Sequence, residues 1–157
     1  MTQRNVTHGT FCIERRFDAA PARVFKAFSD IKAKQQWFNG PPGWVRNHHE
    51  LDFRVGGQEI SDVGPPGGMH HIFQARYWDI VPNERIVFSY DMQMDRTRIS
   101  VSLTTVELRP DGGGTRLCFT EQGVFFADSD GPDGREEGTK FLLDALAVSL
   151  TEAPADA

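Results

Sequence analysis

The sequence predicts an α+β domain in which a curved, seven-stranded antiparallel sheet wraps one long C-terminal helix, with two short helices after the first strand. Three observations lead to this fold class. The stretch 133–150 carries apolar residues at helical spacing, whereas the segments before it alternate between apolar and polar residues. Most turns between those segments are too short to hold a crossover helix, so we expect neighbouring strands to be antiparallel.

The final stretch, DGREEGTKFLLDALAVSL, is predicted to be a helix that is buried on most of its circumference. Asp133 is placed to cap the free amides of the first turn, while Glu136 reaches back as in a capping box. Glu136 and Lys140 have the spacing of an ion pair on the wet face. The predicted buried arc is wider than half a turn and consists of Phe141, Leu142, Leu143, Ala145, Leu146, Val148 and Leu150.

Two short helices are predicted between the first two strands. The first strand covers 10–17, and Pro21 then suits the first turn of a helix whose apolar face carries Val24, Phe25 and Phe28. Ser29 or Asp30 can cap a second helix, which we expect to run to residues 37–38. The segment NGPPG at 39–43 ends regular structure.

The other six strands are predicted from alternation interrupted by turns. Gly56-Gly57 turns one strand back on the next, and the segments GPPGG and PDGGG cannot be regular. Neither glycine-rich segment is followed by the lysine and helix of a phosphate-binding loop, so both are interpreted as turns. The predicted strands are 44–53, 58–63, 69–81, 86–90, 99–108 and 115–120.

Length and composition predict one soluble domain over 1–157, with a core at 10–150 and a frayed tail at 151–157. The net charge of -5 comes without a basic cluster, so a nucleic-acid partner is not expected. No apolar run is as long as a membrane span, and the first residues lack the apolar region of a signal peptide. A cytoplasmic location is therefore expected, with Cys12 and Cys118 as reduced strand thiols.

Odd-numbered strand positions, if they face the helix, would enclose a chamber with mainly apolar walls. Apolar walls give affinity for a small molecule and a few polar groups orient it, so this pattern favours a ligand cavity. The alternative is that the aromatic residues form an ordinary core and that the carboxylates lie at solvated strand ends. The predicted inward residues are His49, Phe53, Glu59, His71, Phe73, Tyr77, Phe88, Tyr90, Val101, Leu103, Phe119 and Glu121.

The histidines come in two adjacent pairs, His48-His49 and His70-His71. Adjacent strand residues point to opposite faces, so each pair offers one inward imidazole, and no compact metal-binding spacing is present. We therefore expect neither a metal site nor a cofactor. Catalysis by Glu59, His71 and Glu121 as general acid and base is an open alternative, because a histidine near neutrality beside a carboxylate can exchange protons. Arg135 is expected either to pair with Glu121 or to be solvated.

The chain contains, in this order, the segments ERRFDAAPARVFKAFSD, Trp37, LDFRVGG, DIVPNERIVFSYDM, TRLCFTEQGVF and the final helix with Gly138. Together these segments resemble the START-like, helix-grip superfamily, in its branch of activators of heat-shock-protein-90 ATPase homologues. The resemblance implies a β-α-α-β6-α helix-grip fold and a ligand-sized cavity between sheet and helix. Two positions depart from the pattern: Thr139 stands where many relatives carry tryptophan, and Glu59 where an aromatic residue is common.

The main functional prediction is a protein that binds a small hydrophobic or amphipathic molecule, with Trp37, Phe141, Leu142 and Ala145 joining the inward residues as its contacts. Two alternatives remain: a cyclase or hydrolase using Glu59, His71 and Glu121, and a chaperone-associated interaction module. A membrane partner is not expected, and a homodimer through the exposed sheet or early helices is possible. Glu59 with Ser61 is expected to form a polar wall that favours a ligand with a hydrogen-bond donor or positive charge.

Overall fold

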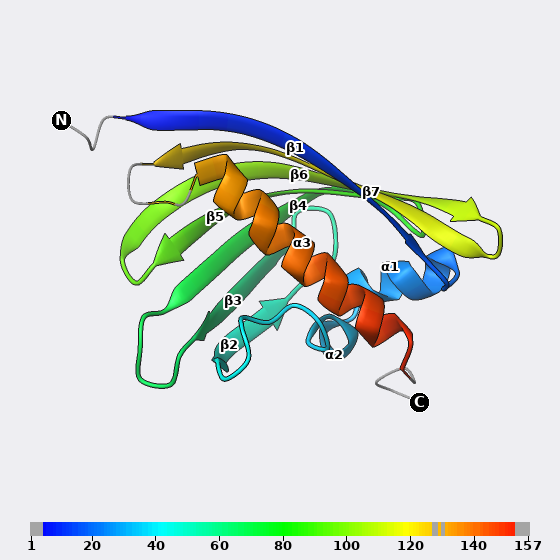
Figure 1. The fold of residues 1–157 in the computed structure, drawn as a ribbon, viewed down its shortest axis with the longest axis horizontal. Coiled ribbons are helices and arrows are strands. Elements are labelled where there is room, and N and C mark those ends of the chain that lie inside the picture. The colour runs from blue at the N-terminus through cyan, green and yellow to red at the C-terminus, as the bar shows by residue number, and fades with distance from the viewer. Residues whose placement is uncertain (1–4, 127–128, 130, 153–157) are drawn as a thin grey trace.

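A single curved, open antiparallel sheet holds one long helix across its face, as the sequence predicts (Figure 1). The structure is a computed structural model and describes residues 5–126, 129 and 131–152. The seven strands lie in the order β1-β7-β6-β5-β4-β3-β2. They are β1 Val6–Phe17, β2 Val45–Leu51, β3 Gln58–Gly64, β4 His71–Val81, β5 Arg85–Met94, β6 Thr97–Asp111 and β7 Gly114–Phe126. The helices are α1 Pro21–Ser29, α2 Ile31–Lys34 and α3 Gly131–Leu150.

The turn between β6 and β7 shows how the sequence sets a strand pairing. Asp111 and Gly114 are partners at the end of the ladder, and the two residues between them, Gly112 and Gly113, both have positive φ. Two-residue hairpins need this left-handed backbone to match the twist of the strands, and glycine adopts it without steric strain. The predicted turn is therefore confirmed, although β6 extends to Asp111 and β7 begins at Gly114, beyond the predicted strand ends at 108 and 115.

The short helices α1 and α2 lie near the C-terminal end of α3 (Figure 1). Asp30 caps α2 by accepting a hydrogen bond from the Ala33 amide at 3.0 Å, so it is the correct one of the two predicted caps, Ser29 and Asp30. The predicted extension to residue 38 is wrong, since α2 ends at Lys34 and the chain continues in turns. Trp37 is fixed there by an indole hydrogen bond to the Ala27 carbonyl at 2.9 Å.

The core lies between α3, α1 and the concave face of the sheet. Leu143 and Leu146 of α3 are almost fully buried, and they belong to one apolar cluster with β1 and the other strands. Burial of this apolar surface is the main favourable term in folding. The buried strand members of this cluster are Phe11, Ile13, Phe17, Phe73, Ala75, Tyr77, Ile86, Phe88, Tyr90, Val106, Leu108 and Leu117.

The prediction that Val101 and Leu103 point inward is wrong. Their side chains are 44% and 41% exposed on the outer face of the sheet. The reason is a register shift at Met92/Gln93 of β5, where β6 gains an extra residue and its buried positions change from odd to even. The buried residues of β6 are therefore Ile99 at the shift itself, and Ser100, Ser102, Thr104, Val106 and Leu108 after it.

The helix α3 is less buried than predicted. It begins at Gly131, so Asp133 lies inside the first turn instead of capping it. The Glu136–Lys140 ion pair is present at 3.5 Å. Phe141 and Val148 are 48% and 60% exposed, because the sheet covers one face of the helix only.

Cys12 of β1 and Cys118 of β7 are free thiols whose Sγ atoms lie 3.0 Å apart. Pairing of the two strands brings them together in spite of their separation in sequence. Within the described part of the chain, no helix is both long and apolar enough to cross a membrane. Thr151 and Glu152 of the predicted tail follow α3, and residues 153–157 lie outside the described residues.

Candidate functional site

A cavity of about 520 Å³ lies between α3, the concave face of the sheet and the segment that follows α2. This volume is in the range of small-molecule sites. Its lining is mainly aromatic and aliphatic, with few polar side chains. The lining side chains from the sheet are Ser61, Val63, His71, Phe73, Phe88, Tyr90, Met92, Met94, Ile99, Phe119 and Glu121, and those from the helices and following segment include Phe28, Lys34, Trp37, Phe38, Trp44, Arg135, Thr139, Phe141, Leu142 and Leu143.

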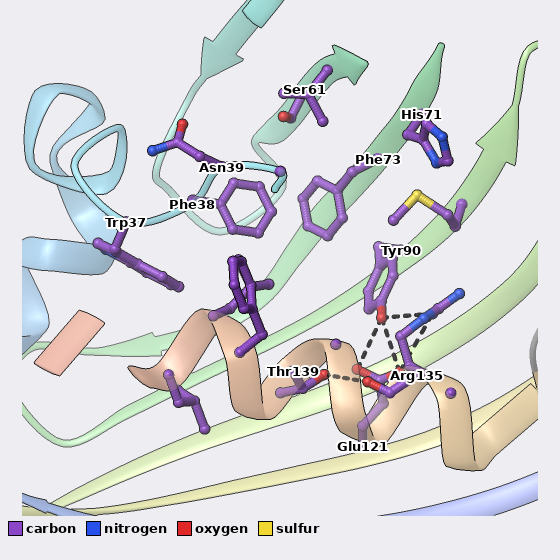
Figure 2. A pocket seen from close by; sticks show the side chains of 18 of the residues that line it. Trp37, Phe38, Asn39, Ser61, His71, Phe73, Tyr90, Glu121, Arg135 and Thr139 are labelled. Carbon is purple, nitrogen blue, oxygen red and sulfur yellow. Dashed lines mark hydrogen bonds and ion pairs between the residues drawn. The ribbon is translucent and has the colours of Figure 1, made fainter. Parts of the chain in front are cut away.

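A row of aromatic rings forms the wall opposite α3. Phe38, Phe73 and Tyr90 follow one another along the cavity (Figure 2), with ring centroids 5.1 and 4.7 Å apart. Phe88 lies beside this row, 6.3 Å from Phe73. Such contacts hold rings in fixed orientations, so the wall is pre-formed.

One end of the cavity carries a polar cluster around Glu121, which is 1% exposed. The Tyr90 hydroxyl lies 2.9 Å from both carboxylate oxygens and donates to them, and the Thr104 hydroxyl donates at 3.3 Å. Arg135 of α3 approaches the same carboxylate at 3.6 Å and donates to Tyr90 at 2.8 Å and to Ser100 at 2.7 Å (Figure 2). This confirms the pairing of Arg135 with Glu121 as the correct one of the two alternatives.

Burial has the largest effect on the acid-base properties of this cluster. It raises the pKa of Glu121 above its ordinary value, although Arg135 and the hydrogen bonds oppose that rise. Burial and the Glu121 charge also raise the pKa of Tyr90. Tyr90 therefore remains protonated as the donor, and Glu121 takes up a proton more readily than an exposed carboxylate.

A second polar cluster lies around Glu59 of β3, which has no exposed surface. Lys34 of α2 and the Tyr77 hydroxyl each donate to one carboxylate oxygen at 2.6 Å. His49 contacts the other oxygen through Nε2 at 2.8 Å, and its Nδ1 lies 3.1 Å from the Gln35 side-chain amide nitrogen. That nitrogen is a donor, so Nδ1 accepts, and His49 donates to Glu59 through Nε2.

Burial would raise the pKa of Glu59, but the Lys34 charge and the three hydrogen bonds together lower it. Tyr77 shows the opposite effect, because burial and the Glu59 charge raise its pKa well above the ordinary value. The Lys34 ammonium also lies 4.6 Å from the Phe38 ring centroid and 5.7 Å from that of Phe73. Glu59 is thus a fully paired anion behind the cavity wall.

The exposed members of the lining mark the mouth of the cavity. Phe141 of α3 is 48% exposed there. Trp44 and His71, both partly buried, contact each other there with ring centroids 4.5 Å apart and an interplanar angle of 38°. Partial burial lowers the pKa of His71, against the opposing charges of Asp95 and Asp62. Gly138 also lines the cavity, and a side-chain carbon added to it would meet nothing within 4 Å.

Residues 18–151 match the family model described as Activator of Hsp90 ATPase homolog 1-like protein. The chain belongs to this family. The match covers most of the chain and confirms the resemblance that the sequence motifs indicate. Among curated proteins, none matches the chain significantly.

Solved structures of several bacterial proteins have the same fold as this family member. The Mll3558 protein from Rhizobium loti is 48% identical, with a TM-score of 0.86 over 94% of this chain and 100% of that chain. A protein from Rhizobium leguminosarum is 44% identical, also with a TM-score of 0.86, over 94% and 97%. The CV1439 protein from Chromobacterium violaceum is 31% identical, with a TM-score of 0.77 over 92% and 98%.

The structure of this family member places the predicted contact residues in three groups. His49, Phe53, Glu59, Tyr77 and Ala145 are outside the cavity lining: His49, Glu59 and Tyr77 form the second cluster, Phe53 packs against Tyr77, and Ala145 packs against the core. Val101 and Leu103 are on the outer face. Those that line the cavity are Trp37, His71, Phe73, Phe88, Tyr90, Phe119, Glu121, Phe141 and Leu142.

Lys34, Phe38, Trp44, Met92 and Met94 line the cavity without having been predicted to do so. A lysine in a short helix is ordinarily solvated, so the sequence contains no signal that Lys34 is 3% exposed. The alternation of β5 does place Met92 and Met94 on the same face as Tyr90, so the sequence pattern could have predicted that both methionines line the cavity.

The histidines do not gather into a metal site. Within the ranges that the structure describes, no three His, Cys, Asp or Glu side chains are arranged to hold a metal ion. His48 of β2 pairs with Glu50, and His70, just before β4, pairs with Asp62; both histidine side chains are exposed. His49 and His71 belong to the second cluster and to the mouth, respectively.

Glu59 and Glu121 are expected to give opposite contributions to the pH dependence of stability. The pKa of Glu59 is lowered in the folded state, so its stabilising effect is present above the ordinary value of 4.5 and is lost as pH falls through the folded pKa. The pKa of Glu121 is raised, so its charge reduces stability as pH rises from 4.5 through the folded pKa. Urea unfolding measured across this pH range tests both contributions. In Glu59→Gln the free energy of unfolding should fall less at acid pH than in the wild type, and in Glu121→Gln it should rise more steeply with pH. The same dependence of the free energy of unfolding on pH in both variants would contradict this assignment.

Proposed function

We propose that the protein binds a small, largely apolar molecule in the cavity between the sheet and α3. The observation that carries this proposal is the cavity of about 520 Å³ with a row of aromatic rings along one wall and a polar cluster at one end. Apolar walls with a few convergent polar groups are typical of small-molecule sites. The family membership supports the same conclusion as an analogy of fold.

The enzyme alternative has less support because its three residues are separated. Glu59 lies in β3 and Glu121 in β7, four steps apart in the strand order, which is roughly 19 Å along the sheet. Glu59 has no exposed surface, and His71 contacts Trp44 at the mouth. A general acid and base must both reach one bound molecule. Chaperone association and a homodimer stay predictions from the sequence.

Binding can be tested with N-phenylnaphthylamine, an uncharged aromatic dye whose fluorescence rises in an apolar site. We expect saturable binding of one molecule per chain. At a free dye concentration of about 100 times Kd, the thermal midpoint should rise by about 5–10 °C, since only the folded protein has the cavity. Fluorescence that never saturates, or saturation without a rise in the midpoint, would contradict the proposal.

A further inference from the structure

Among the residues that the structure describes, the charged side chains that line the cavity are two cations and one anion: Lys34, Arg135 and Glu121. The other carboxylate, Glu59, lies behind Lys34 with no exposed surface. Of the three lining charges, the side chain of Arg135 is the most accessible, at 14% exposed against 3% for Lys34 and 1% for Glu121. A ligand in the cavity therefore meets a guanidinium before it meets a carboxylate.

The accessible hydrogen-bonding group at this end is a donor, because the Arg135 side chain is 14% exposed and the Glu121 side chain 1%. Glu121 already accepts from Tyr90 through both oxygens and from Thr104. Arg135 has five N–H groups, and its hydrogen bonds to Tyr90 and Ser100 use one on each terminal nitrogen. The guanidinium is also held in place, since its carbon lies 5.5 Å from the Tyr90 ring centroid and 5.2 Å from that of Phe125.

The local backbone adds positive potential to the same end. Arg135 is the fifth residue of α3, and Gly131 and Gly134 of the first turns line the cavity beside it. The N-terminal end of a helix carries a partial positive charge. Because burial raises the pKa of Glu121, that carboxyl can also become neutral when a second anion arrives.

We propose that the ligand is a weak organic acid, an apolar body carrying one oxyanion, and that the oxyanion binds Arg135. This inference rests on the proposed function and adds the chemical class of the ligand. The sequence led us to expect a ligand with a hydrogen-bond donor or a positive charge, which Glu59 would bind. The structure favours the opposite charge, because Glu59 is fully paired and Arg135 is the accessible group. The apolar body would lie along Phe73 and Phe38, away from the polar end.

Two dyes that differ by one group test this inference: N-phenylnaphthylamine and its sulfonate, anilinonaphthalene sulfonate. With the wild-type protein we expect the sulfonate to bind about 10-fold to 100-fold more tightly than the uncharged dye, the ratio expected for one hydrogen bond to a charged group. Arg135→Met should reduce this ratio to about 1 or below, because only the sulfonate loses a charged hydrogen bond when the guanidinium is removed. Arg98→Gln, on the outer face where Arg98 pairs with Asp91 at 3.0 Å, is the matched control and should keep the ratio.

Glu121→Gln separates ligand binding from a merely structural role of Arg135. It removes the anion beside Arg135, so the ratio should rise above the wild-type value. If Arg135→Met does not fold, the double variant Arg135→Met/Glu121→Gln, which leaves no unpaired buried carboxylate, replaces it. Equal binding of the two dyes, or a ratio unchanged in Arg135→Met, would overturn the inference and leave the proposed function standing. Failure of both dyes to bind would overturn the proposed function and the inference with it.

Discussion

Lys34→Met is expected to lower the free energy of unfolding by about 3–5 kcal/mol, which corresponds to a fall of about 6–20 °C in the thermal midpoint. Lys34 and Glu59 form a buried ion pair with 2.6 Å between Nζ and the carboxylate oxygen. Methionine fills a similar volume but leaves Glu59 without a cation in a site with no exposed surface. An unpaired buried charge is far less favourable than an exposed one.

Chemical unfolding of two further variants would isolate the ion pair. Lys32→Met, at an exposed position of the same short helix, is the matched control and should change stability by less than about 0.5 kcal/mol. In the double variant Lys34→Met/Glu59→Gln, much of the lost stability should return, because the unpaired charge is gone. Equal losses in Lys34→Met and Lys32→Met would show that Lys34 is not paired in the folded protein.

Gly138→Trp is expected to weaken binding of N-phenylnaphthylamine by about 10-fold to 150-fold. Space is open around Gly138 at the mouth of the cavity, so an indole there can fold into the cavity and cover apolar surface. Burial of a large side chain gains about 1.5–3 kcal/mol, which the dye must overcome to displace it. Fluorescence titration of the wild type and the variant measures the ratio.

Two substitutions in the same helix control for effects on the fold. Glu137→Trp places the same side chain on the solvent side, where the Glu137 side chain is 77% exposed, and should leave dye affinity unchanged. Gly138→Ala should raise the free energy of unfolding by about 0.5–1 kcal/mol, because glycine is unfavourable inside a helix. Unchanged affinity in Gly138→Trp would place the dye outside this cavity.

The sequence was sufficient for the parts of the fold that depend on local patterns. Pro21 and Asp30 mark the starts of the short helices, and paired glycines mark the turn at Gly112-Gly113, because each acts through its own backbone or cap. The face of β6 could not be predicted, since the register shift at Met92/Gln93 depends on how two strands fit together. Val101 and Leu103 were misplaced for this reason alone.

The sequence predicted which carboxylates of the candidate site are buried, but not which cations pair with them. Alternation placed Glu59 and Glu121 inward correctly, and both are buried. Their partners come from separate elements: Lys34 from α2 and Arg135 from α3. The helical position of Arg135 made its pairing one of two open alternatives, whereas nothing local to Lys34 indicates a buried ammonium. The predicted polar wall at Glu59 is therefore a closed cluster outside the cavity lining.

The position of β1 in the sheet has a consequence for the order in which the protein folds during synthesis. β1 is made first, yet it pairs only with β7, and the contacting thiols Cys12 and Cys118 are 106 residues apart. Hairpins from β2 to β6 can form as the chain leaves the ribosome. Phe11 and Ile13 of β1 stay unpaired until β7 has been synthesised. Sheets closed by such distant contacts fold in about milliseconds to seconds, so completion of this domain depends on one late pairing step.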